Sequence, residues 1–150
     1  MSDAVRIDAA TLSDLDEIVP LFDGYRVFYR QSSDLAATRA FLHERLSRGE
    51  SVIYLARVGA RAAGFAQLYP TFGSVSLGTR WILNDLFVDP AHRRHGLGRA
   101  LTLRAMQHTR DTDAHQLMLL TEHSNTAAQR LYESLGWQLD QMYRRYTWKP

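Results

Sequence analysis

The sequence feature that most constrains the fold is a glycine-containing loop between an expected strand and an expected helix. Residues 81–88 are rich in Ile, Leu, Phe and Val, which favours a strand. Asp89-Pro90 ends this strand, and Gly96 and Gly98 follow just before a run with helical character. The first amides of a helix have no partner within it, and glycine lets a ligand approach them. The loop therefore predicts a binding site for an anion such as a pyrophosphate.

Basic side chains strengthen this interpretation, because Arg93, Arg94 and Arg99 carry donors that suit phosphate oxygens. The loop lacks the Gly-Lys-Ser/Thr of a Walker loop, and a leucine takes the place of the third glycine of the Rossmann fingerprint. The pattern Arg93-x-x-Gly96-x-Gly98 after a strand instead resembles motif A of the GNAT superfamily of N-acetyltransferases. In that family the motif holds the pyrophosphate of acetyl-coenzyme A, so the resemblance implies acetyl-CoA as a co-substrate.

A second segment, Asn125-x-x-Ala128-x-x-Leu131-Tyr132-x-x-Leu135-Gly136-Trp137, resembles motif B of the same superfamily. The resemblance implies that two parallel strands, 81–88 and 116–121, splay apart and admit the pantetheine arm. It also implies that Asn125 bonds this arm and that the Tyr132 hydroxyl protonates the departing CoA thiolate, as a phenol of pKa about 10 can do. The residues implied to bind acetyl-CoA are Leu86, Phe87, Val88, Arg93, Arg94, His95, Gly96, Leu97, Gly98, Arg99, Asn125 and Tyr132.

Composition excludes several other classes of protein. The 150 residues are 45% hydrophobic and 23% charged, as in an ordinary globular domain. The absence of Cys excludes disulfides and a thiol nucleophile, and the six His show no metal-ligand spacing, so no metal is expected. A net charge of +2 does not indicate a nucleic-acid partner, and no apolar run reaches membrane-spanning length. Because no signal peptide opens the chain, a cytoplasmic location is expected.

Hydrophobic periodicity and capping residues predict the order of the elements. Strands are expected at 5–9, 51–58, 62–69, 81–88 and 116–121, with a closing hairpin at 137–140 and 142–148. Helices are expected at about 12–30, 35–48, 98–109 and 126–135. Pro20 and Gly24 predict a kink or a break in the first helix. Residues 70–80, rich in Gly and Ser, are expected to form a loop.

This order predicts an α/β fold, and the resemblance implies that residues 1–150 form a single GNAT N-acetyltransferase domain. The strand–helix–strand unit from 81 to 121 requires a parallel pair with a right-handed crossover. The family resemblance implies a mixed, mostly antiparallel sheet, with the splayed parallel pair at its centre and helices on both faces. Ligands of open α/β sheets bind beyond the carboxyl ends of strands, where the Gly96/Gly98 loop is expected to lie.

The acceptor amine must be neutral to attack a thioester, so a base or a proton-conducting water is needed. Around 83–88 the chain is similar to polyamine acetyltransferases, but these have an acidic residue where this chain has Asn84, which cannot act as a base. Strand alternation predicts that Asp85 points to the face opposite Asn84. The candidate catalytic carboxylates are Asp85 and Glu122, and proton removal through ordered water with their help is the favoured route.

Three aromatic residues, Tyr25, Phe28 and Tyr29, share one face of the first helix. They are interpreted either as core packing or as a wall of the acceptor pocket, together with Asn84 and the 70–80 loop. The expected acceptor is a small amine, a polyamine, an amino acid, or a peptide or protein amine.

These features predict an acyltransferase, in which the amine attacks acetyl-CoA directly in a ternary complex. The alternative is a non-catalytic acyl-CoA-binding regulatory module, which would keep the loop but need neither Tyr132 nor an amine pocket. Neither nucleic acid nor a membrane is expected as a partner, and a homodimer is compatible with the sequence.

Overall fold

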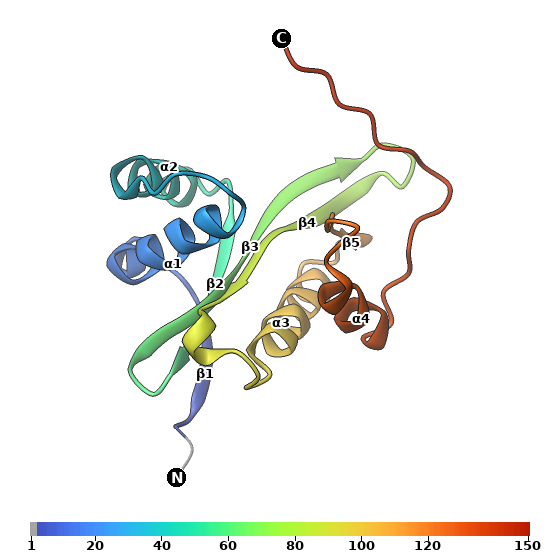
Figure 1. Ribbon diagram of the computed structural model, residues 1–150. Helices are drawn as coiled ribbons and strands as arrows, with labels where there is room; N and C mark the ends of the chain where they lie inside the picture. Colours follow the sequence, from blue (N-terminus) through green and yellow to red (C-terminus); the bar gives the residue numbers. More distant parts are fainter. Residues whose placement is uncertain (1–2) are drawn as a thin grey trace. The chain divides into compact units, whose positions relative to one another are not determined.

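The computed structural model describes residues 3–150, which form two compact units, one ending at Leu120 and the other running from Thr121 to Pro150. The first unit contains a five-stranded sheet in the order β1-β2-β3-β4-β5 (Figure 1). The strands are β1 (Val5–Ala9), β2 (Val52–Val58), β3 (Arg61–Gly73), β4 (Gly78–Val88) and β5 (Gln116–Met118). Neighbouring strands are antiparallel except for the parallel pair β4–β5. The predicted mixed, mostly antiparallel α/β sheet is therefore confirmed.

Helices cover both faces of this sheet, as the sequence predicts. They are α1 (Leu15–Phe28), α2 (Leu35–Ser47) and α3 (Leu97–Asp111), with short 3-10 turns at Leu12–Asp14 and Pro90–His92. Figure 1 shows α1 and α2 on one side of the sheet and α3 on the other. Ile18, Phe22 and Leu42 from the first pair pack with Leu55 and Phe65 of the strands in one buried core. On α3, Leu97, Leu101 and Ala105 are buried.

The predicted break in the first helix does not occur, because α1 runs without interruption through Pro20 and Gly24. Pro20 costs one helical hydrogen bond, but the buried side chains on either side of it, Val19 and Leu21, hold both halves against the core. Gly24 faces the sheet, where a Cβ would lie 3.6 Å from the ring of Phe87. Both residues are therefore accommodated by tertiary packing, which local sequence preferences do not contain.

The predicted 70–80 loop is instead the end of a long hairpin. β3 continues to Gly73 and β4 begins at Gly78, so that Pro70 pairs with Trp81. Proline is tolerated there because β2 pairs with β3 only as far as Leu68, and Pro70 lies beyond that ladder. Glycine and proline thus mark the turn of the hairpin and the edge of the ladder rather than a long loop.

The second unit contains α4 (Thr126–Ser134) and a following segment without regular structure. The predicted strands at 137–140 and 142–148 do not form. The apolar side chains of the predicted hairpin are exposed, among them Leu139, Tyr143 and Trp148. A two-stranded hairpin that buries no apolar face is only marginally stable in water. Among the described residues the sheet accordingly ends at β5, and the parallel pair lies at its edge rather than at its centre.

A buried arginine joins the start of α1 to the sheet. The guanidinium of Arg57 on β2 donates to both carboxylate oxygens of Glu17, at 2.9 and 3.1 Å, and to Asp14 at 2.8 Å. A backbone hydrogen bond from Thr11 and then the Arg57 side chain lower the pKa of Asp14, while the hydrogen bond from Arg57 is the main cause of the lowered pKa of Glu17. These charges are paired and hydrogen-bonded, so the network stabilises the fold at neutral pH.

Replacing Arg57 with Met is expected to lower the free energy of unfolding by about 2 kcal/mol at pH 7, because two carboxylates lose a charged donor. Carboxylates with a lowered pKa in the folded state stabilise it above their unfolded pKa, near 3.8 and 4.5 here, and this contribution is lost as the pH falls through the folded values. Urea unfolding at several pH values should therefore show a deficit that shrinks below about pH 4. Arg61→Met, at an exposed position, is the control, and an equal loss in both variants would contradict the role of the network.

Candidate functional site

The two parallel strands separate after three residues. β4 pairs with β3 from Gly78 to Val88, but it pairs with β5 only over Arg80–Ile82. The β4–β5 ladder ends at Ile82, opposite Met118. The edge of residues 83–88 on that side therefore carries main-chain donors and acceptors beyond the ladder. The predicted parallel pair is therefore present, and the residues Leu86, Phe87 and Val88, predicted to bind acetyl-CoA, lie on the part of β4 beyond its ladder with β5.

The glycine loop lies between β4 and α3 and has the backbone geometry of an anion site. Arg94 and Gly96 have φ angles of 69° and 73°, in the left-handed region. Gly96 is the N-cap of α3, and a Cβ there would meet nothing within 4 Å, so the approach to the helix start is open. The first backbone bond into this end of the helix is from the amide of Ala100 to the carbonyl of Gly96. The amides of Leu97, Gly98 and Arg99 therefore lie at the positive end of the helix dipole, next to three exposed arginines.

One of these arginines is engaged with the neighbouring strand and helix. The Nε of Arg93 donates to the carbonyl of Val88 at 3.3 Å. Its guanidinium lies 5.8 Å from the ring centroid of Phe28 and 6.0 Å from that of Phe87. Arg93 thus connects the loop to the end of α1, whereas Arg94 and His95 are exposed.

An extra residue in β4 determines which way Asp85 points. Gln67 of β3 pairs with Asp85, while the next residue, Leu68, pairs with Leu83, so that Asn84 is left opposite no residue of its own. Such a bulge interrupts strand alternation. The Asn84 amide nitrogen donates to Asp85 Oδ1 at 3.1 Å, so the prediction that the two side chains occupy opposite faces is wrong. Directly paired residues share a face, and Asp85 therefore lies beside Gln67.

Asp85 is the centre of a buried polar cluster. The side chain is 5% exposed, and Gln67 Nε2 donates to its Oδ2 at 2.7 Å. The same amide nitrogen lies 3.0 Å from the Tyr69 hydroxyl oxygen. Within residues 3–150, no Arg, Lys or His forms an ion pair with Asp85. A carboxylate satisfied only by neutral donors is unusual in an interior, because buried charges are normally paired.

Tyrosine hydroxyls gather around this carboxylate. Burial raises the pKa of Tyr25 strongly, and the charge of Asp85 and a hydrogen bond to that carboxylate raise it further, with smaller contributions from Tyr29 and Tyr69. Burial and then the charge of Asp85 raise the pKa of Tyr69 to about 12. Tyr25 and Tyr69 therefore stay protonated at neutral pH and can act there as hydrogen-bond donors.

The aromatic face of α1 serves packing at one end and is exposed at the other. Tyr25 contacts the rings of Phe65 and Phe87 at centroid distances of 5.9 and 6.2 Å, so it belongs to the margin of the core. Tyr29 is half-buried and lies edge-on to Tyr25 at 5.0 Å, while Phe28 is 54% exposed. The structure thus places Tyr25 next to Asp85 and Tyr29 next to Tyr25, while the acceptor pocket itself stays a prediction.

Three other predicted residues lie in the second unit. The Asn125 side-chain oxygen accepts a hydrogen bond from the amide of Ala128 at 3.2 Å and caps α4. Tyr132 lies on this helix, with its ring centroid 5.5 Å from that of Trp137. The main-chain carbonyl of Glu122 accepts from the amide of Asn125 at 2.9 Å. The local fold of the motif B segment is therefore the predicted capped helix.

Sequence reasoning missed Gln67 and Tyr69. Every second residue of a strand points to the same face, so Gln67 and Tyr69 are expected on the face that carries Phe65. Two polar side chains on a core-facing side of a strand are a signal that the sequence does contain. What could not be read from the sequence is the bulge, which places Asp85 rather than Asn84 opposite Gln67.

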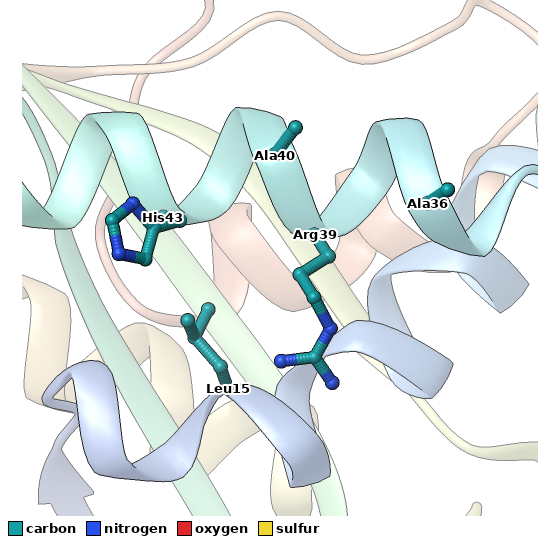
Figure 2. A pocket seen from close by; sticks show the side chains of 5 residues that line it. All are labelled: Leu15, Ala36, Arg39, Ala40 and His43. Carbon is teal, nitrogen blue, oxygen red and sulfur yellow. The ribbon is translucent and has the colours of Figure 1, made fainter.

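A separate surface pocket lies between α1 and α2, with a volume of about 470 Å³ (Figure 2). It is lined by Leu15, Ala36, Arg39, Ala40 and His43, none of which is a predicted site residue. In the part of the chain that the structure describes, no group of three or more His, Cys, Asp or Glu could hold a metal ion. No helix among these residues is long and apolar enough to cross a membrane.

The raised pKa of Tyr69 can be checked by titration. Replacing Tyr69 with Phe should leave unchanged the phenolate absorbance that the folded protein develops between about pH 10 and 11, because Tyr69 is still protonated there. A free tyrosine derivative, whose phenol has a pKa of about 10, supplies the reference signal of one tyrosine over the same range. A group with a raised folded pKa stabilises the fold below its unfolded pKa, here about 10, and this contribution is lost as the pH rises through about 12. A loss of signal in Tyr69→Phe as large as this reference would contradict the burial of Tyr69 beside an anion.

Comparison with known proteins agrees with this geometry. The model of the acetyltransferase (GNAT) family matches residues 15–137. The uncharacterized N-acetyltransferase YhfO of Bacillus subtilis is 46% identical over 142 residues, which cover 95% of each chain. A mycothiol acetyltransferase of Thermobispora bispora is 56% identical over 61 residues, which cover 39% of this chain and 21% of that protein.

A solved structure supports the same assignment. The crystal structure of a probable acetyltransferase matches 97% of each chain with a TM-score of 0.92 and 44% sequence identity. The family match covers both the glycine loop at the start of α3 and the capped helix α4. This chain is therefore an acetyltransferase of the GNAT family.

Proposed function

We propose that the protein transfers the acetyl group of acetyl-CoA to a primary amine. The observation that carries the proposal is the glycine loop at the start of α3, directly after a strand whose ladder with β5 ends at Ile82. Open amides, a helix dipole and three arginines suit a pyrophosphate, and the separated strand offers main-chain groups to a pantetheine arm. The acceptor is a small amine, a polyamine, an amino acid, or a peptide or protein amine.

The proposed reaction is direct attack in a ternary complex. The amine nitrogen forms a bond to the thioester carbonyl carbon, and negative charge develops on the carbonyl oxygen. A main-chain N–H of the separated part of β4 stabilises this oxyanion. The carbon–sulfur bond then breaks, and its electron pair leaves with the sulfur. Starting from the ammonium form of the acceptor, the products are the N-acetylated amine, CoA thiol and one released proton.

The reaction needs two proton transfers, one to the thiolate and one from the amine. Tyr132 donates a proton to the thiolate, which the match of its segment to motif B supports. The amine loses its proton through ordered water, aided by Asp85 or Glu122. Asp85 is supported by its burial next to Tyr25 and Tyr69, and Glu122 by its place just before the Asn125 cap.

The loop is tested by Gly98→Asp, which adds bulk and a negative charge at the proposed phosphate position. CoA should bind at least about tenfold more weakly in calorimetry, because like charges are brought together at the helix start. Gln107→Asp, at an exposed position later in α3, is the matched control and should bind CoA as the wild type does. Unchanged affinity in a folded Gly98→Asp protein would place the phosphates elsewhere.

The proton donor is tested by Tyr132→Phe, which keeps the ring and its packing against Trp137 but removes the hydroxyl proton. We expect kcat to fall between about tenfold and a thousandfold, the range for a lost general acid, with little change in the KM for acetyl-CoA. Tyr143→Phe serves as the control in the same segment. An unchanged kcat across the pH profile would show that the thiolate takes its proton from water.

A further inference from the structure

The cluster around Asp85 has more acceptor capacity than the protein itself uses. Gln67 is fully buried, and its amide nitrogen must face the carboxylate, because the amide oxygen there would be repelled. Gln67 Oε1 consequently points away from Asp85, and it has no hydrogen-bond partner among the described residues. A buried polar atom without a partner costs free energy, so a donor from a ligand would be accommodated favourably.

The charge of the cluster defines what kind of donor fits. Asp85 carries a negative charge without an ion-pair partner in the described chain. Arg45 of α2 is near enough to lower the pKa of Tyr69, but its own charge is paired with Glu44 at 3.1 Å and Glu50 at 2.8 Å. Arg93 is stacked on Phe28 and Phe87. The cluster is therefore an anionic position that a bound cation would neutralise.

The walls of the cluster also suit a cation. The Tyr69 hydroxyl lies 3.0 Å from the Gln67 nitrogen that contacts Asp85, and the charge of Asp85 raises the pKa of both Tyr25 and Tyr69. The half-buried ring of Tyr29 lies edge-on to Tyr25 at 5.0 Å. Aromatic faces attract ammonium groups, most strongly where water is excluded. A carboxylate next to this tyrosine group thus combines charge pairing, hydrogen bonding and cation–π attraction.

We propose that Asp85, Gln67 and the three tyrosines bind the ammonium group of a cationic acceptor amine that has no neighbouring carboxylate. This inference rests on the proposed acetyl transfer to an amine, and it narrows the substrate class. Amines are mostly protonated at neutral pH, so the site captures the abundant form before the proton is lost. A carboxylate on the adjacent carbon would be brought close to Asp85 and repelled. Amines such as decarboxylated amino acids fit these requirements, and the α-amino groups of free amino acids do not.

The first test uses the wild-type enzyme and matched pairs of compounds. Phenethylamine, tyramine and histamine are compared with phenylalanine, tyrosine and histidine by release of CoA thiol from acetyl-CoA. We expect kcat/KM to be at least about tenfold higher for the amine in at least one pair, and in no pair higher for the amino acid. Equal or better use of the amino acids would overturn the inference, as would failure of all three amines.

These outcomes separate the inference from the proposed function. Thiol release with peptide amines but not with the three small amines would leave acetyl transfer standing and overturn the inference. The absence of thiol release with every amine, peptide and protein tried would overturn both.

The second test assigns the effect to the cluster. Asp85→Asn removes the charge at nearly constant volume, and we expect the KM for the best amine to rise about tenfold or more. The KM for acetyl-CoA should change less than about twofold. Asp113→Asn, which removes an exposed carboxylate at the turn after α3, should leave both constants unchanged. A fall in kcat with an unchanged amine KM would mean that Asp85 removes the proton without binding the ammonium group, and would overturn the inference.

The melting temperature of each variant is measured to check that it folds. A second variant covers the case in which Asp85→Asn does not fold. Tyr69→Leu keeps an apolar, half-buried side chain but removes the ring face and the hydroxyl. The amine KM should rise several-fold with the acetyl-CoA KM unchanged. Unchanged amine KM in this folded variant would overturn the role of the tyrosines.

Discussion

The bulge at Asn84 is the constraint on which the rest of the site depends. Because one extra residue sits in β4, the side chains after it change face, and Asp85 and Phe87 join Gln67 and Phe65 on the side covered by α1. Without the bulge, Asp85 would oppose Ala66 and point toward the other face. β4 pairs with β3 along its whole length but pairs with β5 over three residues only. One edge of residues 83–88 therefore lies beyond the β4–β5 ladder.

Chemistry and stability are thereby placed on different parts of one sheet. The core of α1, α2 and the strands, together with the Arg57 network, holds the helices on the sheet, and only Phe87 and, at the margin, Tyr25 among the predicted site residues take part in it. Around Asp85, by contrast, the described residues supply no counter-ion to a buried carboxylate and no donor to a buried amide oxygen. Such unsatisfied groups cost stability and are concentrated at functional sites, where a ligand completes them.

Much of this could be predicted from the sequence, because it rests on local patterns. The glycine loop, the cap at Asn125, the parallel pair and the bounds of α2 and α4 follow from turn residues, caps and periodicity. The continuity of α1 through Pro20, the length of the β3–β4 hairpin and the irregular segment after α4 depend on what these residues pack against. The orientation of Asp85 depends on a register shift, which moves side chains between faces without any mark in the composition, so its position opposite Gln67 could not be predicted.

The central claim is that the separated half of β4 and the start of α3 together form the acetyl-CoA site. The most direct measurement is a titration of the labelled protein with CoA, followed by the amide resonances in two-dimensional NMR. The account predicts that the largest shifts occur at Leu86–Val88 and His95–Arg99, while residues that line the α1–α2 pocket, such as Ala36 and Ala40, stay unchanged. Shifts concentrated on that pocket, or spread without preference for the loop, would contradict it.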